Sequence, residues 1–155
     1  MKNIAKDIAG KAWAAPMTAI GIVAGTILSG TSWITRHGAR IAIENNAITF
    51  TTGFNLNGSI TFGNSIIHAG GDIRKWNSKS AMLRYNRAAY VNLGKHEEAH
   101  TYQYQRYGIF TIPLLVSSAI ANGGLKASRF FEFMAKSDFE NVADDYAQFG
   151  WSPIP

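Results

Sequence analysis

The first long pattern of the chain is an uncharged, mostly apolar run near its beginning. Residues 12–35 contain no Asp, Glu, Lys or Arg, and Lys11 and Arg36 flank the run. Gly21 and Gly25 are four residues apart, a spacing that lets a helix pack closely against a neighbour. We predict a buried, glycine-containing helix. Membrane insertion and a cleaved signal peptide are the alternatives, because basic residues precede an apolar stretch.

After residue 40 the pattern of hydrophobic and polar residues changes to one typical of β-strands. Residues 41–50 comprise two short runs of β-type residues separated by Asn45-Asn46, and asparagine tolerates the positive φ of a tight turn. Asn57-Gly58 is a second turn signal, and Ser59 to Ile67 follows it as another strand-type run. Residues 41–68 therefore predict a small antiparallel meander, which a glycine-rich stretch ends.

The pattern from Ser78 onward favours helices. Pro113 suits the first turn of a helix that the glycines at 123 and 124 would end. A last helix is predicted to start near Ser137 and to end at Gly150, with an extended, proline-containing tail after it.

These elements and the chain length indicate one α+β domain. The chain has 155 residues, which fits a single domain over residues 1–155 with residues 1–36 as its apolar N-terminal segment. Hydrophobic residues make up 46% and charged residues 16%, a composition that argues against disorder. The net charge is +5, but the basic residues are scattered, which argues against a nucleic-acid partner.

The candidate chemistry depends on histidine, because the chain has no cysteine and only four histidines. Any metal must therefore be bound by His, Asp or Glu. His96 and His100 lie four residues apart in a predicted helix, so both imidazoles can reach one ion. Glu97 is then placed to take a proton from a water on that ion. The alternative is a solvated helix face whose charges form surface pairs.

A catalytic zinc site needs a third protein ligand. No histidine follows His100, so we expect a carboxylate. Glu140 and Asp144 are four apart in the last predicted helix, so Glu140 can bind the ion while Asp144 accepts the second ring N–H of a histidine ligand. The alternatives are that Glu140 caps its own helix together with Ser137, and that Glu132 is the ligand.

Further polar residues are expected beside this site. Gln103 and Tyr107 continue the helix face of the two histidines and are predicted to line the same cleft. A tetrahedral intermediate also needs a hydrogen-bond donor, and Tyr146 and His68 are among the candidates. The sequence does not choose among them, and His68 has an ordinary loop position as its alternative.

The motifs resemble a known family. HEEAH followed by ENVAD resembles the HExxH and downstream ExxxD pattern of the gluzincin zinc metallopeptidases. GSITFGNSII, HEEAHTYQYQRYG and FENVADDYA are similar to small bacterial HExxH domains, some of which are metallopeptidase toxin modules of polymorphic and type VI secretion systems. The resemblance implies a minimal zincin-like fold and one Zn²⁺ bound by His96, His100 and Glu140. It also implies that Glu97 is the general base and that Asp144 contacts a metal ligand and not the ion itself.

The same resemblance implies a function. We expect a zinc metallopeptidase that cleaves an amide bond in a polypeptide or a peptidoglycan peptide, as a bacterial toxin or effector module. A cognate immunity protein is then an expected partner, and a secreted or delivered protein with a periplasmic target is the expected context. The alternatives are a membrane-associated zinc protein, held through residues 12–35, and a non-catalytic zinc-binding protein of the same fold.

Overall fold

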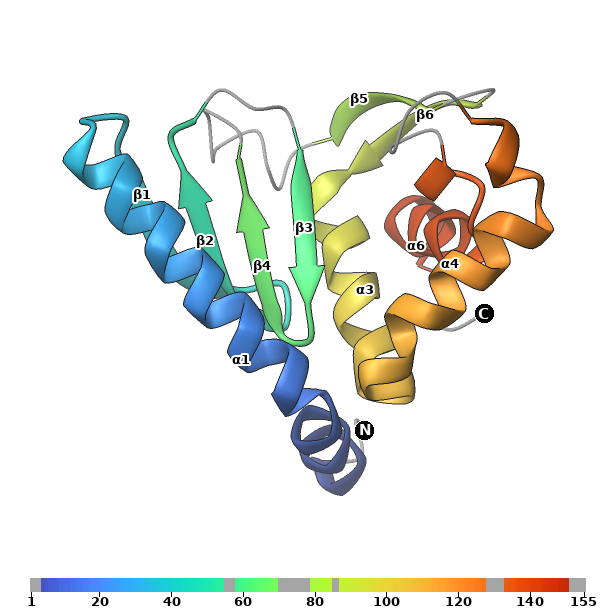
Figure 1. The fold of residues 1–155 in the computed structure, drawn as a ribbon, viewed down its shortest axis with the longest axis horizontal. Helices are drawn as coiled ribbons and strands as arrows, with labels where there is room; N and C mark the ends of the chain where they lie inside the picture. Colours follow the sequence, from blue (N-terminus) through green and yellow to red (C-terminus); the bar gives the residue numbers. More distant parts are fainter. Residues whose placement is uncertain (1–3, 55–57, 70–78, 85–86, 128–132, 151–155) are drawn as a thin grey trace.

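The computed structural model describes residues 4–54, 58–69, 79–84, 87–127 and 133–150 of the chain. A long helix comes first, followed by a four-stranded sheet, a separate hairpin and a helical C-terminal half (Figure 1). This is the α+β class predicted from the sequence, with the apolar helix at the N-terminal end and the HExxH helix in the C-terminal half.

Helix α1 (Ile4–Ile34) buries one stripe of mostly small residues. The stripe consists of Ala14, Met17, Gly21, Gly25, Ser29 and Ser32. A Cβ atom at Gly21 would lie 2.7 Å from the Cβ of Ser65, and one at Gly25 would lie 2.4 Å from the ring of Phe50. The two glycines therefore let the helix backbone lie directly on the strands.

The four-stranded sheet is mixed and has the order β1-β2-β4-β3. Strands β1 (Ala39–Glu44) and β2 (Ala47–Thr52) form one antiparallel hairpin, and β3 (Ser59–Phe62) and β4 (Ser65–His68) form another. The prediction of an antiparallel meander is wrong for the central pair, because β2 and β4 are parallel. The chain reverses after β3, so β3 takes the outer position and β4 returns beside β2.

The turns explain where the strands end. Asn45 and Asn46 have φ angles of 51° and 58°, as predicted for the first tight turn. The second hairpin turns at Gly63-Asn64, where Gly63 has a φ of 58°. The single strand predicted from Ser59 to Ile67 is therefore two strands. Asn57, in the turn predicted before it, lies outside the described residues.

Strands β5 (Lys79–Arg84) and β6 (Arg87–Asn92) form a separate antiparallel hairpin. The prediction of helix after Ser78 is wrong for these two strands. Their sequences contain alanine, methionine, leucine and arginine, which are good helix formers, so strand pairing overrides local propensity here.

The C-terminal half contains α3 (Leu93–Tyr107), α4 (Thr111–Ala121) and α6 (Asp138–Phe149), with the 3-10 turns η1 (Gly108–Phe110) and η2 (Gly124–Lys126). Pro113 lies in the first turn of α4, as predicted. Gly150 ends α6 in the left-handed conformation with a φ of 73°, also as predicted. The predicted tail after it lies outside the described residues.

Helix α3 connects the other layers of the fold. Its first residue, Leu93, packs against a buried cluster of Ala47 and Ile66 from the sheet. Tyr104, near its other end, packs with Ala14 and Met17 of α1. Beyond α3, on the side away from the sheet, lies α6 (Figure 1). The HExxH helix is thus enclosed between the sheet, α1 and α6.

Candidate metal centre

The sequence around the HExxH motif forms a helix with defined ends. The Asn92 side chain accepts a hydrogen bond from the Lys95 backbone N–H at 2.9 Å, which caps the start of α3. Gly108, with a φ of 57°, ends the helix. The buried residues between these ends include His96, Glu97, Glu98 and His100. The motif therefore lies in the interior and not on a solvated helix face.

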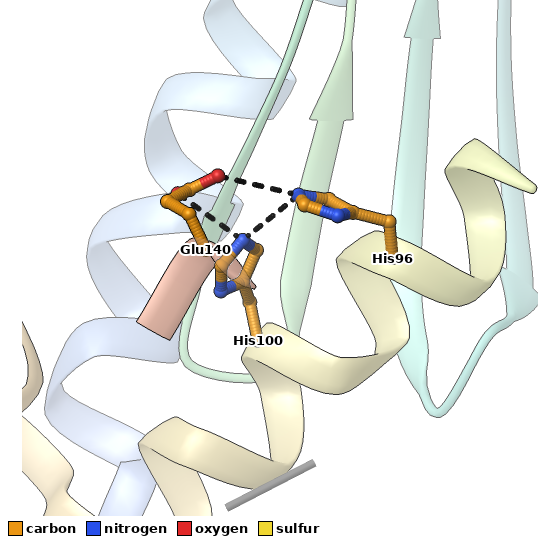
Figure 2. A group of neighbouring side chains, drawn as sticks. All are labelled: His96, His100 and Glu140. Carbon is orange, nitrogen blue, oxygen red and sulfur yellow. Dashed lines mark hydrogen bonds and ion pairs between the residues drawn. The ribbon is translucent and has the colours of Figure 1, made fainter. Parts of the chain in front are cut away.

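The three predicted ligands converge (Figure 2). The Nε2 atoms of His96 and His100 are 3.1 Å apart. The two carboxylate oxygens of Glu140 lie 3.5 Å from Nε2 of His96 and 3.4 Å from Nε2 of His100. Atoms bound at 2.0–2.1 Å to one tetrahedral ion are about 3.3 Å apart, which is close to the distance between the two Nε2 atoms. With one oxygen taken from Glu140, the three ligand atoms lie within 4.8 Å of one another. This group can hold a metal ion.

The Nδ1 atoms of His96 and His100 both lie within hydrogen-bond distance of other side chains. Nδ1 of His96 is 2.9 Å from an oxygen of Asp144, and Nδ1 of His100 is 2.8 Å from Oε1 of Gln103. The amide of Gln103 is oriented by its own Nε2, which donates to the Phe139 carbonyl at 2.9 Å. A carboxylate and an amide oxygen both accept, so each Nδ1 carries the ring proton and each Nε2 presents a lone pair.

These lone pairs and the charge of Glu140 favour a cation at the centre of the group. Two unprotonated ring nitrogens 3.1 Å apart repel each other unless a proton or a cation lies between them. Burial by itself would raise the pKa of Glu140, but the positive charges and hydrogen bonds of the His100 and His96 rings, when both rings are protonated, outweigh burial and lower the pKa well below its usual value. A cation bound between neutral rings would act on the carboxylate in the same direction.

Ser137 and Glu140 have separate roles at the start of α6. The Ser137 hydroxyl caps the helix by accepting from the Phe139 backbone N–H at 3.2 Å. The backbone N–H of Ser137 donates to the Met134 carbonyl, and the Glu140 carboxylate faces the imidazoles. The alternative ligand, Glu132, lies outside the described residues.

Glu97 is held by the sheet. Its side chain is buried, and one carboxylate oxygen accepts a hydrogen bond from the Thr61 hydroxyl at 2.6 Å. A hydroxyl-to-carboxylate bond of this length is charge-assisted and fixes the orientation of the carboxylate. Thr61 lies on β3, the outer strand of the sheet next to α3. The sequence pointed to Glu97 but gave no signal for Thr61.

The other predicted residues of the cleft have different surroundings. Gln103 is buried and contacts the candidate ligand His100. The ring of Tyr107 packs edge-on against Phe139, with centroids 5.6 Å apart. The predictions placed both residues beside the histidines, and in the structure both contribute to the packing of α3 against α6.

Tyr146 belongs to a second polar cluster, in which Glu98 is the buried member. Its hydroxyl and that of Tyr102 donate to the same oxygen of Glu98, at 3.1 and 3.2 Å. Lys95 forms an ion pair with the other oxygen of this carboxylate. Burial and the nearby Glu98 raise the pKa of Tyr146, so its hydroxyl stays protonated. This cluster joins α3 to α6, and Glu98 is its common acceptor.

His68 lies at the end of β4 and contacts β3. Its Nδ1 is 2.8 Å from the Ser59 hydroxyl, and its side chain is buried. Burial lowers the pKa of His68 to about 4, so the ring is neutral at pH 7. Within the described residues, the group that can hold a metal consists of His96, His100 and Glu140 and does not include His68.

Comparisons of the chain with protein-family models, with curated proteins and with solved structures found no match. The arrangement of the side chains is therefore the basis for a functional proposal.

Proposed function

We propose that the chain is a zinc-dependent hydrolase that cleaves an amide bond. The observation that carries this proposal is the triangle of two Nε2 atoms and a carboxylate, with both Nδ1 atoms engaged elsewhere. Nitrogen and oxygen ligands in tetrahedral arrangement suit zinc. Three protein ligands leave one position for water, which is the arrangement of catalytic zinc sites.

Glu97 is the proposed general base. When bound, the ion supplies a water whose pKa is lowered to about 7. Glu97 would accept a proton from the attacking water and would pass it to the leaving nitrogen when the amide C–N bond breaks. Asp144 and Gln103 keep the imidazoles in the tautomer that leaves Nε2 available. Thr61 fixes the orientation of the Glu97 carboxylate.

The proposed substrate is an extended peptide. Among the described strands, β3 pairs only with β4, so its outer side offers backbone groups to a further strand close to Thr61 and Glu97. The resemblance of the motifs to bacterial toxin modules supports a polypeptide or a peptidoglycan peptide as substrate. It also supports a toxin or effector context with a cognate immunity protein.

Replacing the base tests catalysis separately from metal binding. We expect Glu97→Gln to keep one equivalent of zinc and to lower peptide hydrolysis about 10²–10⁴-fold, because the amide cannot accept the proton. Elemental analysis measures the zinc. Mass spectrometry of peptides and peptidoglycan fragments measures hydrolysis.

Two control variants make this test specific. Glu140→Gln should lose both zinc and hydrolysis, because it removes a ligand. Asp145→Asn, next to Asp144 on α6, should change neither. Equal hydrolysis by the wild type and Glu97→Gln would reject catalysis at this site.

A non-catalytic zinc protein is the second candidate. The hydrogen bond between Glu97 and Thr61 favours it, since a carboxylate held by the fold can have a purely structural role. This candidate predicts one equivalent of zinc in the wild type and in Glu97→Gln, and no hydrolysis by either protein.

A further inference from the structure

The outer face of α1 is apolar and exposed. It is a row of residues opposite the buried stripe, formed by Ile20, Val23, Ile27 and Ile34, which are 53 to 77% exposed. Trp13 and Trp33 are also exposed, near the two ends of the row but on different sides of the helix, because 20 residues at about 100° each turn them about 160° apart. They are 20 residues apart, which is about 30 Å along a helix. Among the described residues, α1 is the one helix long and apolar enough to cross a membrane.

Basic residues outnumber carboxylates in α1 and the residues after it, and in a second segment that contacts α1 through η1. Residues 4–43, which include all of α1, contain four cations, Lys6, Lys11, Arg36 and Arg40, and one carboxylate, Asp7, which forms an ion pair with Lys11 at 2.8 Å. Residues 99–131, which include η1 and α4, contain no Asp or Glu and three cations: Arg106, Lys126 and Arg129. The charge of both segments complements an anionic surface.

A mostly apolar pocket of about 390 Å³ adjoins the beginning of the outer α1 face. Its lining includes Trp13 of α1, Phe110 of η1 and Leu114 of α4, and all three side chains are exposed. Arg106 is its charged residue. Apolar walls beside a guanidinium suit an acyl chain below an anionic headgroup.

We propose that the outer α1 face docks on the surface of an anionic phospholipid bilayer, with α1 lying in the plane of the interface. An exposed apolar row along one side, exposed tryptophans near both ends of the helix and an excess of cations over carboxylates are features of an interfacial helix. A second copy of the chain is a poorer occupant, because two faces flanked by cations repel each other. The proposal does not depend on the metal or on catalysis.

The opposite face of α1 explains why the helix lies on the bilayer and does not cross it. Gly21 and Gly25 lie directly against Ser65 and Phe50 of the sheet. Near the end of the helix, the Ser32 hydroxyl donates to the Gly38 carbonyl at 2.7 Å. If α1 crossed the membrane, either the strands would enter the hydrocarbon layer with it or α1 would detach from the sheet. An open sheet edge in hydrocarbon is very unfavourable.

Vesicle flotation with the full chain tests this proposal. We expect at least about tenfold stronger binding to vesicles of phosphatidylcholine with phosphatidylglycerol than to phosphatidylcholine alone, and weaker binding at high salt. The double variant Ile20→Glu/Ile27→Glu should lower binding at least about tenfold, because it places two carboxylates on the face. Gln148→Glu/Phe149→Glu is the matched control. It places two carboxylates at exposed positions of α6, away from α1 (Figure 1), and binding should not change.

Three results would overturn the proposal. The first is equal binding by the wild type and the double variant, or no binding to anionic vesicles. The second is a lipid-free dimer, seen by light scattering, that the double variant dissociates, which would assign the face to a second copy. The third is retention of the protein in vesicles after carbonate extraction, which would indicate a spanning helix. Circular dichroism and zinc content should be those of the wild type in every variant.

Discussion

Gln103 acts on a candidate metal ligand from within the same helix. It accepts from Nδ1 of His100 and is fixed by the Phe139 carbonyl. Gln103→Leu keeps the approximate volume and removes the acceptor, so the imidazole of His100 is no longer held in one tautomer. We expect zinc affinity to fall about 10–100-fold, measured by competition with a chromophoric chelator.

Two further variants separate this role from general packing. Gln148→Leu makes the same change at an exposed position of α6 and should leave zinc affinity unaltered. Gln103→Glu restores an acceptor for His100 and should recover most of the affinity. An affinity of Gln103→Leu equal to that of the wild type would show that Gln103 does not position the ligand.

At the residue scale, the sequence predicted the ligand group because helical spacing translates directly into geometry. The i, i+4 pairs His96–His100 and Glu140–Asp144 each fix two side chains on one helix face. Thr61 was not predictable, because its contact with Glu97 requires knowing which strand lies beside α3. The partner of Tyr146 was missed for the same reason, since Glu98 belongs to another helix.

The packing of α1 on the sheet depends on its glycines. A Cβ atom at Gly25 would lie 2.4 Å from the ring of Phe50, whereas one at Gly30 would have nothing within 4 Å. We expect Gly25→Ala to lower the free energy of unfolding by about 1–3 kcal/mol through overpacking. Gly30→Ala should raise it by about 0.5–1 kcal/mol, because alanine favours the helix. Urea unfolding measures both.

Comparing Gly25→Ala with Gly30→Ala separates the effect of packing from that of helix propensity. Both substitutions add one methyl group to α1, so their effect on helix propensity is the same. Equal stability of the two variants would mean that α1 does not pack on β2 as described.

At the element scale, the ends of the last helix and the first tight turn were predictable, but the strand order of the sheet was not. Ser137, Gly150 and Asn45-Asn46 are local signals, and each acts where it occurs in the chain. The parallel pairing of β2 with β4 joins segments that are not consecutive, so no local pattern encodes it. For β5 and β6, local propensity pointed to the wrong structure.

The candidate metal site joins α3 to α6, so an ion would stabilise the whole molecule. Zinc that binds only the folded chain, at 1,000 times its dissociation constant, adds about 4 kcal/mol to the free energy of unfolding. For a chain of this size we expect removal of zinc by EDTA to lower the Tm by about 8–16 °C. Differential scanning calorimetry with and without zinc measures the change.

The same measurement on two variants tests where the ion acts. Glu140→Gln should have a Tm that zinc hardly changes, since the carboxylate from α6 is gone. Asp145→Asn should respond to zinc like the wild type. A wild-type Tm that EDTA leaves unchanged would contradict a metal link between these helices.

The separation of the ligands along the chain has a consequence for biosynthesis. His96 and His100 leave the ribosome first, and Glu140 follows 40 residues after the second histidine. A nascent chain therefore carries an incomplete set of candidate ligands until α6 is made and docks on α3. Any chemistry that needs all three side chains would begin only after that docking.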